Sequence, residues 1–106
     1  MYKFVFFVPE THADAVKAAV FAVGAGRIGD YDRCCWQISG QGQFRPLAGS
    51  QPYLGREGAV ETVNEYRVEM VCADDRIRAA ISALRQAHPY EEPAYDVWKL
   101  ADLSAE

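Results

Sequence analysis

His88-Pro89-Tyr90-Glu91-Glu92-Pro93-Ala94-Tyr95-Asp96 joins the clearest helical pattern of the chain to its last strand-like segment. Proline fixes the backbone angle φ, lacks an N–H group and disfavours the α conformation in the residue before it. His88 is therefore expected to end a helix, and Pro93 to lie outside any central strand. We predict a stiff, extended corner that holds polar side chains in fixed directions, which binding sites and subunit contacts both require.

A helix is predicted before this corner and a strand after it. The apolar residues of the helix recur at positions i, i+3, i+4 and i+7: Ile77, Ala80, Ile81 and Leu84. Asp74 is expected to cap the helix at its N-terminus. Residues 95–100 then form the predicted last strand.

The N-terminal part of the chain predicts a strand, a helix and a second strand. Residues 2–8 are an apolar run rich in aromatic and β-branched residues, as in a buried strand near the middle of a sheet. Thr11 and Asp14 fit a capping box for the helix that follows, and residues 24–26 should end it. Residues 33–39 alternate in polarity, which predicts a half-buried strand. Its core-facing residues would be Cys34, Trp36 and Ile38.

The middle of the chain contrasts a long loop with a long strand. Residues 40–58 are rich in glycine and proline, with a few large apolar anchors: Phe44, Leu47, Tyr53 and Leu54. Loops of this length in compact domains are usually functional or disordered. Residues 61–72 alternate again and predict a strand with one charged, solvent-facing side.

The order of these elements is strand, helix, strand, strand, helix, strand. It predicts an α+β fold, a ferredoxin-like βαββαβ sandwich in which two helices cover one face of an antiparallel sheet. Residues 1–106 are expected to form a single domain. The other sheet face must be solvated, covered by the long loop or buried against another subunit, and the aromatic content favours a subunit.

Composition and charge exclude several classes of function. The net charge of −4 argues against a nucleic-acid surface, because phosphate binding requires clustered Lys and Arg. No apolar stretch approaches the roughly 20 residues of a membrane helix, and no secretory signal is recognisable, so we expect a cytoplasmic protein without membrane contact. Three cysteines, an odd number, do not make a disulfide framework.

Two short motifs have simple structural interpretations. Residues 24–29 match G-x-G-x-x-G, but they follow a helix where a dinucleotide-binding motif must follow a strand, so we predict a helix end and a tight turn with positive φ. Cys34 and Cys35 are neighbours, which point to opposite faces of a strand, so we expect one core cysteine beside one surface thiol.

The corner permits two interpretations. His88 and Glu91, with Glu92 nearby, could bind a divalent metal ion such as zinc or copper, although their spacing is not diagnostic. Alternatively, His88 bonds a backbone group at the helix end, the two glutamates pair with arginines, and Tyr90 and Tyr95 pack.

Several sequence blocks in the same order resemble one known family. They are residues 24–34 with Tyr31 and Cys34, residues 42–49 with Phe44, Pro46 and Gly49, the strand at 61–69 and the corner at 88–96. Together they resemble the insert domain of the YqfO-type, NGG-interacting-factor-like family over nearly the whole chain. The His-Pro-Tyr-Glu-x-Pro core is also similar to CutA, a divalent-ion tolerance family that shares the ferredoxin-like fold with the PII signalling proteins.

The resemblance implies a CutA/PII-like module that forms a homo-oligomer, with a trimer favoured. Larger members of the family wrap this insert in two flanking segments that supply the ligands of a two-metal centre. The sequence here does not contain them, so neither that centre nor its hydrolase activity is carried over. By similarity to PII, residues 40–58 take the place of an effector-binding loop that also contacts protein partners.

We therefore expect a non-catalytic, oligomeric regulatory or ligand-binding module with sites at subunit clefts. The expected ligand or interface residues are Tyr31, Phe44, Pro46, Gly49, Tyr90, Glu92 and Tyr95. The alternative is a CutA-like protein that binds a divalent metal through His88 and Glu91. An enzyme is not expected, because no nucleophile and base are paired at a recognisable spacing.

Overall fold

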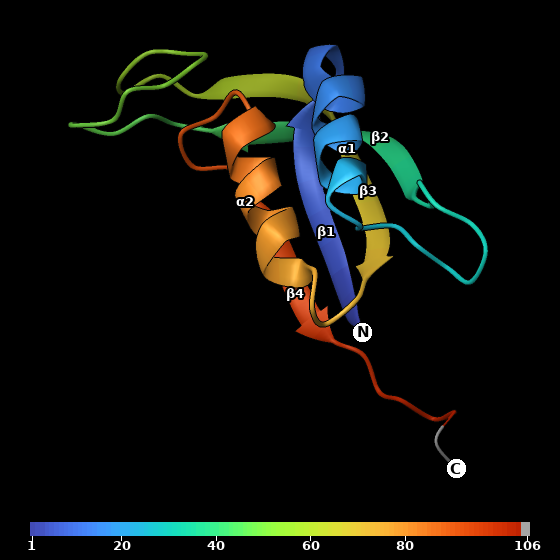
Figure 1. The fold of residues 1–106 in the computed structure, drawn as a ribbon. Helices are drawn as coiled ribbons and strands as arrows, with labels where there is room; N and C mark the ends of the chain where they lie inside the picture. The colour runs from blue at the N-terminus through green and yellow to red at the C-terminus, as the bar shows by residue number, and fades with distance from the viewer. Residues whose placement is uncertain (105–106) are drawn as a thin grey trace.

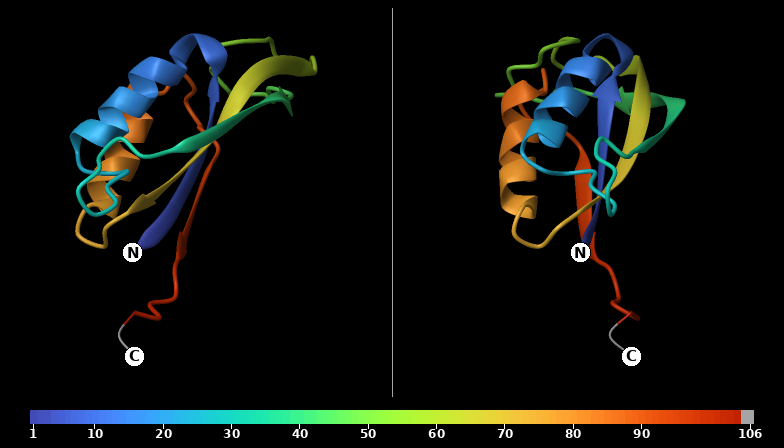
Figure 2. Two further views of the ribbon diagram at one scale, coloured as in Figure 1. Left: turned by 90° about the vertical axis from the view of Figure 1, so that its right-hand side faces the viewer. Right: turned by 45° about the vertical axis from the view of Figure 1, so that its right-hand side comes forward.

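The computed structural model, which describes residues 1–104, has two layers (Figures 1 and 2). The elements are β1 (Tyr2–Pro9), the 3-10 helix η1 (Glu10–His12), α1 (Ala13–Ala22), β2 (Trp36–Phe44), β3 (Glu61–Cys72), α2 (Ile77–Ala87) and β4 (Tyr95–Lys99). All strand pairs are antiparallel, and the strand order is β2-β3-β1-β4. Both helices cover the same face of the sheet, so the predicted α+β, ferredoxin-like fold is confirmed.

The core lies between the helices and the central strands. β1 runs between β3 and β4, as its apolar run predicted, and alternate residues of β1 face the helices. The fully buried side chains of this layer include Phe4, Phe6, Val8, Val16, Val20, Val68 and Leu84. Removing one such side chain from water stabilises the fold by roughly 1.5–3 kcal/mol. The apolar stripe of α2 is therefore the side on which it packs, as predicted.

The first helix begins without the capping box that Thr11 and Asp14 suggested. His12 occupies the N-cap position and makes no side-chain bond to the helix backbone. The Thr11 hydroxyl instead lies 2.9 Å from Nδ1 of His12. The prediction was wrong because the 3-10 turn moves the first α-helical residue to Ala13, which places Thr11 outside capping reach.

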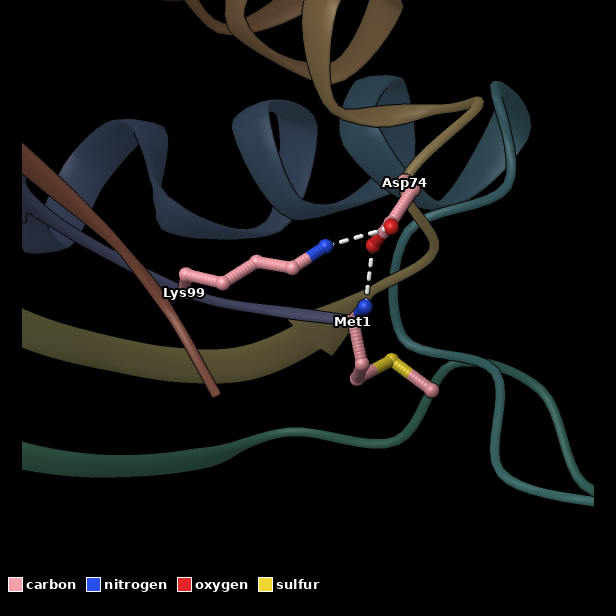
Figure 3. A network of polar contacts seen from close by, with 3 residues as sticks. All are labelled: Met1, Asp74 and Lys99. Atoms are coloured by element: carbon pink, nitrogen blue, oxygen red, sulfur yellow. Dashed lines mark hydrogen bonds and ion pairs between the residues drawn. The ribbon is translucent and has the colours of Figure 1, made fainter. Parts of the chain in front are cut away.

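Asp74 does not cap α2, where Arg76 is the N-cap residue. Its carboxylate accepts hydrogen bonds from the N-terminal ammonium of Met1 and from Nζ of Lys99 (Figure 3). The hydrogen bond from Lys99 is the main cause that lowers the pKa of Asp74. This exposed contact joins the start of β1, the end of β4 and the β3–α2 turn.

The second strand begins later than predicted and faces the other way. Arg33 has a φ of +56°, a turn conformation, and β2 starts only at Trp36. Trp36 and Ile38 are 61% and 52% exposed, whereas Gln37 points to the helix layer and accepts a hydrogen bond from Lys17 at 2.9 Å. Alternation identifies residues that share a face, but it does not identify which face the helices cover. The side opposite the helices, with Trp36, Ile38 and Trp98 from β2 and β4, is called the open face below.

The long loop is shorter than predicted because β2 continues to Phe44. Residues 40–44 pair with β3, and the loop covers residues 45–60. At one of the paired positions, Gly42, the carboxylate of Glu65 occupies the space that a Cβ atom would take. The glycines that allow this close approach also resemble a loop in sequence, which explains the error.

The turn after α1 agrees with the sequence. Gly24 and Gly26 have φ values of +104° and +79°, so the G-x-G-x-x-G match is a helix end and a tight turn. Cys35 is exposed as expected, but Cys34 is only half-buried because it precedes β2. Neither helix within residues 1–104 is long and apolar enough to cross a membrane.

Candidate functional site

A pocket of about 270 Å³ lies where the 45–60 loop meets the 88–96 corner. The sheet supplies Phe7, Gln43, Phe44 and Glu65, the loop supplies Pro46, Ser50, Pro52, Tyr53 and Leu54, and the corner supplies Tyr90, Glu91, Glu92 and Ala94. The loop is held against the corner by the backbone N–H of Gln51, which donates to Oε1 of Glu91 at 2.9 Å. Segments from both halves of the chain therefore form this site.

Tyr90 is the central aromatic residue of the pocket. Its ring centroid lies 5.8 Å from that of Phe44 and 6.4 Å from that of Tyr53. Its hydroxyl is buried and has no hydrogen-bond partner among the described residues. Burial raises the pKa of Tyr90 to about 12, with a smaller contribution from the nearby Glu65. Most buried hydroxyls in proteins are paired, so this hydroxyl is an exception in a residue that lines the pocket.

His88 supports the position of Tyr90. The imidazole is 6% exposed, its Nε2–H donates to the carbonyl oxygen of Phe7 at 2.7 Å, and its Nδ1 accepts the backbone N–H of Tyr90 at 3.1 Å. Burial lowers the pKa of His88, which favours the neutral ring that this pair of bonds requires. His88 thus links the end of α2 to β1 and to the corner.

The two predicted metal ligands have protein partners at their donor atoms. Both ring nitrogens of His88 are bonded, and Oε1 of Glu91 accepts a hydrogen bond from the loop. Within residues 1–104, no group of three or more His, Cys, Asp or Glu side chains is arranged to hold a metal ion. Zinc or copper binding at His88 and Glu91 stays a prediction, and it would require these bonds to break.

Charge in the pocket is exclusively acidic. Its lining contains the carboxylates of Glu65, Glu91 and Glu92, and no Lys or Arg side chain belongs to it. Burial raises the pKa of Glu65, since the ionised carboxylate is partly removed from water. A ligand that donates hydrogen bonds or carries positive charge would stabilise these groups.

The structure brings together some of the predicted site residues and separates others. Those that line the pocket are Phe44, Pro46, Tyr90, Glu91 and Glu92. Tyr31 is 73% exposed at a turn before β2, and Gly49 lies in the loop at a φ of +90° without lining the cavity. Tyr95 packs toward the core, with its ring centroid 6.3 Å from that of Phe4.

Sequence reasoning missed other pocket residues, among them Phe7, Gln43 and Glu65. Phe7 and Glu65 were indistinguishable from other strand residues, because only the twisted ends of three strands bring them to the loop. Tyr53 carried a usable signal, since a large aromatic residue in a polar loop needs a surface to pack on.

The chain is similar in sequence to parts of longer known proteins. No family model matches the chain. A protein of Mycobacterium leprae named GTP cyclohydrolase 1 type 2 homolog is 54% identical over 99 residues, which are 92% of this chain and 26% of that protein. The chain is similar to one segment of a longer protein. It spans about a quarter of the length of the curated relatives it matches.

Solved structures agree with the predicted resemblance. A Bacillus cereus protein related to NIF3 is 42% identical, with a TM-score of 0.81 over 95% of this chain and 26% of that one. The PII-like protein CutA from Nostoc sp. PCC 7120 is 17% identical, with a TM-score of 0.67 over 100% of this chain and 86% of that one. The likeness to CutA concerns the fold alone and confirms the CutA/PII-like architecture.

Proposed function

We propose that this chain is a non-catalytic, oligomeric regulatory or ligand-binding module, equivalent to the insert domain of its longer relatives. The observation that carries the proposal is the pocket between the 45–60 loop and the corner, with the buried, unpaired hydroxyl of Tyr90 in its wall. Mostly apolar clefts with a few polar groups are the usual form of small-ligand sites. The loop also projects from the sheet, where a protein partner can reach it (Figure 1).

The chemistry of the pocket supports binding without catalysis. Tyr90 keeps its proton near neutral pH because its pKa is about 12, and both nitrogens of His88 are used in structural bonds. The name of the relatives belongs to proteins about four times longer, of which this chain matches about a quarter. Incubation with GTP, chosen from that name, is therefore expected to leave the nucleotide intact.

The open face of the sheet supports self-association. Trp36, Ile38 and Trp98 expose 61%, 52% and 44% of their surface on this side. Burying apolar surface stabilises an assembly by roughly 25 cal/mol per Å². We propose a homo-oligomer, with a trimer as the preferred form from the resemblance to CutA and PII.

Native mass spectrometry of the untagged protein tests the proposal. We expect an assembly of three chains of 11.8 kDa each, with an additional small mass in the protein as purified. A bare monomer at micromolar concentration would contradict it. The same measurement after incubation with zinc or copper tests the metal alternative, which requires a retained ion that Glu91→Ala removes.

A further inference from the structure

We propose that the pocket binds a small organic cation, an ammonium group carried on an apolar body about the size of one aromatic ring. This inference rests on the proposed ligand-binding function and specifies the class of ligand. It is carried by the acidic and aromatic lining of the pocket, by its size and by the unpaired hydroxyl in its wall.

The charge of the lining selects against anions. Glu65, Glu91 and Glu92 come from β3 and from the corner, and none of the lining side chains is Lys or Arg. A phosphate or carboxylate ligand would meet these carboxylates without a lysine or arginine in the lining itself. Arg67 lies 5.9 Å from the ring centroid of Phe7, and it pairs with Glu69. An ammonium group would be attracted to them, and the attraction is stronger in a partly desolvated site than in water.

The aromatic walls suit the same ligand. Phe44, Tyr53 and Tyr90 lie with ring centroids 5.8 Å and 6.4 Å apart around one side of the pocket. The faces of aromatic rings attract cations and pack against apolar groups. The volume of about 270 Å³ is slightly below the usual range of ligand pockets, which favours a small molecule.

Glu65 is the group best placed to hold the charge. It lies on β3 at the base of the pocket, where its carboxylate rests against Gly42 and burial penalises the ionised form. Its charge also contributes to the raised pKa of Tyr90, so the two groups are close. A bound ammonium would offset the cost of the partly buried charge of Glu65.

A second depression provides an internal comparison. It is lined by α1, the turn before β2 and the β3–α2 turn, and its cations are Lys17, Arg27, Arg33 and Arg76. Its lining also contains Asp14, Asp32 and Asp75, so it differs from the acidic pocket in carrying both signs of charge. NMR signals from residues of this depression therefore report binding that is unrelated to the proposal.

Three matched probes test the inference: phenethylammonium, phenethyl alcohol and hydrocinnamate, which are a cation, a neutral molecule and an anion on the same phenylethyl body. Each is titrated into the ¹⁵N-labelled protein, and amide shifts of Gln43, Tyr53 and Tyr90 are followed by NMR. Phenethylammonium should saturate these shifts with a Kd about tenfold below that of phenethyl alcohol. Glu65→Gln should raise the Kd of the cation about tenfold.

Glu69→Gln is the matched control, since Glu69 lies on the same strand and face but outside the pocket. It should leave the Kd unchanged, and the spectrum of each variant reports whether the fold is intact. Equal Kd values for all three probes, or no effect of Glu65→Gln, would overturn the proposal that the ligand is a cation. Either result would leave the proposed ligand-binding pocket standing. If no probe shifts the amide resonances of the pocket, the proposal of a cationic ligand is also overturned. The native mass measurement then tests the proposed ligand-binding function separately.

Discussion

His88 and Tyr90 hold each other in position through a hydrogen bond. The backbone N–H of Tyr90 donates to one ring nitrogen of His88, and the other nitrogen donates to Phe7, so the corner is anchored to β1 by one buried imidazole. The ring centroids of the two residues lie 4.9 Å apart. Tyr90 is thereby held in the pocket wall although its own hydroxyl has no partner within residues 1–104.

Tyr90→Phe is expected to leave the free energy of unfolding at pH 7 unchanged or to raise it by up to about 1 kcal/mol. It removes a buried hydroxyl that makes no hydrogen bond to the part of the chain that the structure describes. The variant should also lose less stability in alkali. The folded pKa of about 12 lies above the ordinary 10.0, so the unfolded chain loses this proton first, and wild-type stability falls as the pH rises between those values. Urea unfolding followed by circular dichroism, with exposed Tyr31→Phe as control, measures both effects.

His88→Gln is expected to lower the free energy of unfolding at pH 7 by about 1–3 kcal/mol, because it disrupts two buried hydrogen bonds. The pH dependence should change as well. Burial lowers the folded pKa of His88 below the ordinary 6.5, so its contribution is complete above pH 6.5 and is lost as the pH falls through the folded value. Between pH 7 and pH 5, the free energy of unfolding should change less with pH in His88→Gln than in His12→Gln. Equal slopes would show that His88 does not titrate as argued.

Among the elements, α2 stabilises the fold through one apolar stripe. Leu84 is fully buried against the sheet and the helix ends at the corner, so packing of α2 also positions the corner. Leu84→Ala should reduce the free energy of unfolding by roughly 2–5 kcal/mol in urea denaturation. Leu47→Ala, at a position 62% exposed in the loop, should cost less than about 0.5 kcal/mol. A similarly small loss for Leu84→Ala would refute the packing.

The 45–60 loop is an element whose attachment to the corner depends on few contacts. One of these is the hydrogen bond from the backbone of Gln51 to Glu91. Glu91→Ala should therefore increase hydrogen exchange of the loop amides without a measurable change in global unfolding, because loops of low contact density open locally. Mass-detected exchange measures the rates. Glu92→Ala, which removes a neighbouring carboxylate that has no hydrogen bond to the loop, should leave the exchange rates unchanged. Identical rates in both variants would show that the Gln51–Glu91 hydrogen bond does not hold the loop.

For the whole molecule, we propose that the open face forms the contact between copies. Trp36→Glu should convert the proposed oligomer to a monomer, because it places a charge in an apolar interface, while the fold stays intact because Trp36 is 61% exposed. Size-exclusion chromatography with light scattering measures the mass. Leu47→Glu is the control, since Leu47 is equally exposed but lies in the loop. A monomeric Leu47→Glu and an oligomeric Trp36→Glu would move the interface to the loop.

The sequence by itself determined the order of the elements, the buried central strand, the stripe of α2 and the stiff corner. These features follow from local rules, because proline restricts φ and the two periodicities of helix and strand are visible in the chain. Phe44, Tyr90 and Glu92 were accordingly predicted to form a site, and they line one pocket.

Only the tertiary structure decided which face of β2 is covered, where the helices begin and which side chains complete the pocket. Trp36 and Ile38 share a face in either orientation, and the position of the helices alone determines that this face is open. Antiparallel pairing sets Glu65 opposite Gly40, and its carboxylate reaches toward Gly42, where the missing side chain leaves room for it. Such contacts depend on register and on the packing of distant segments, and neither is encoded in the local pattern of residues.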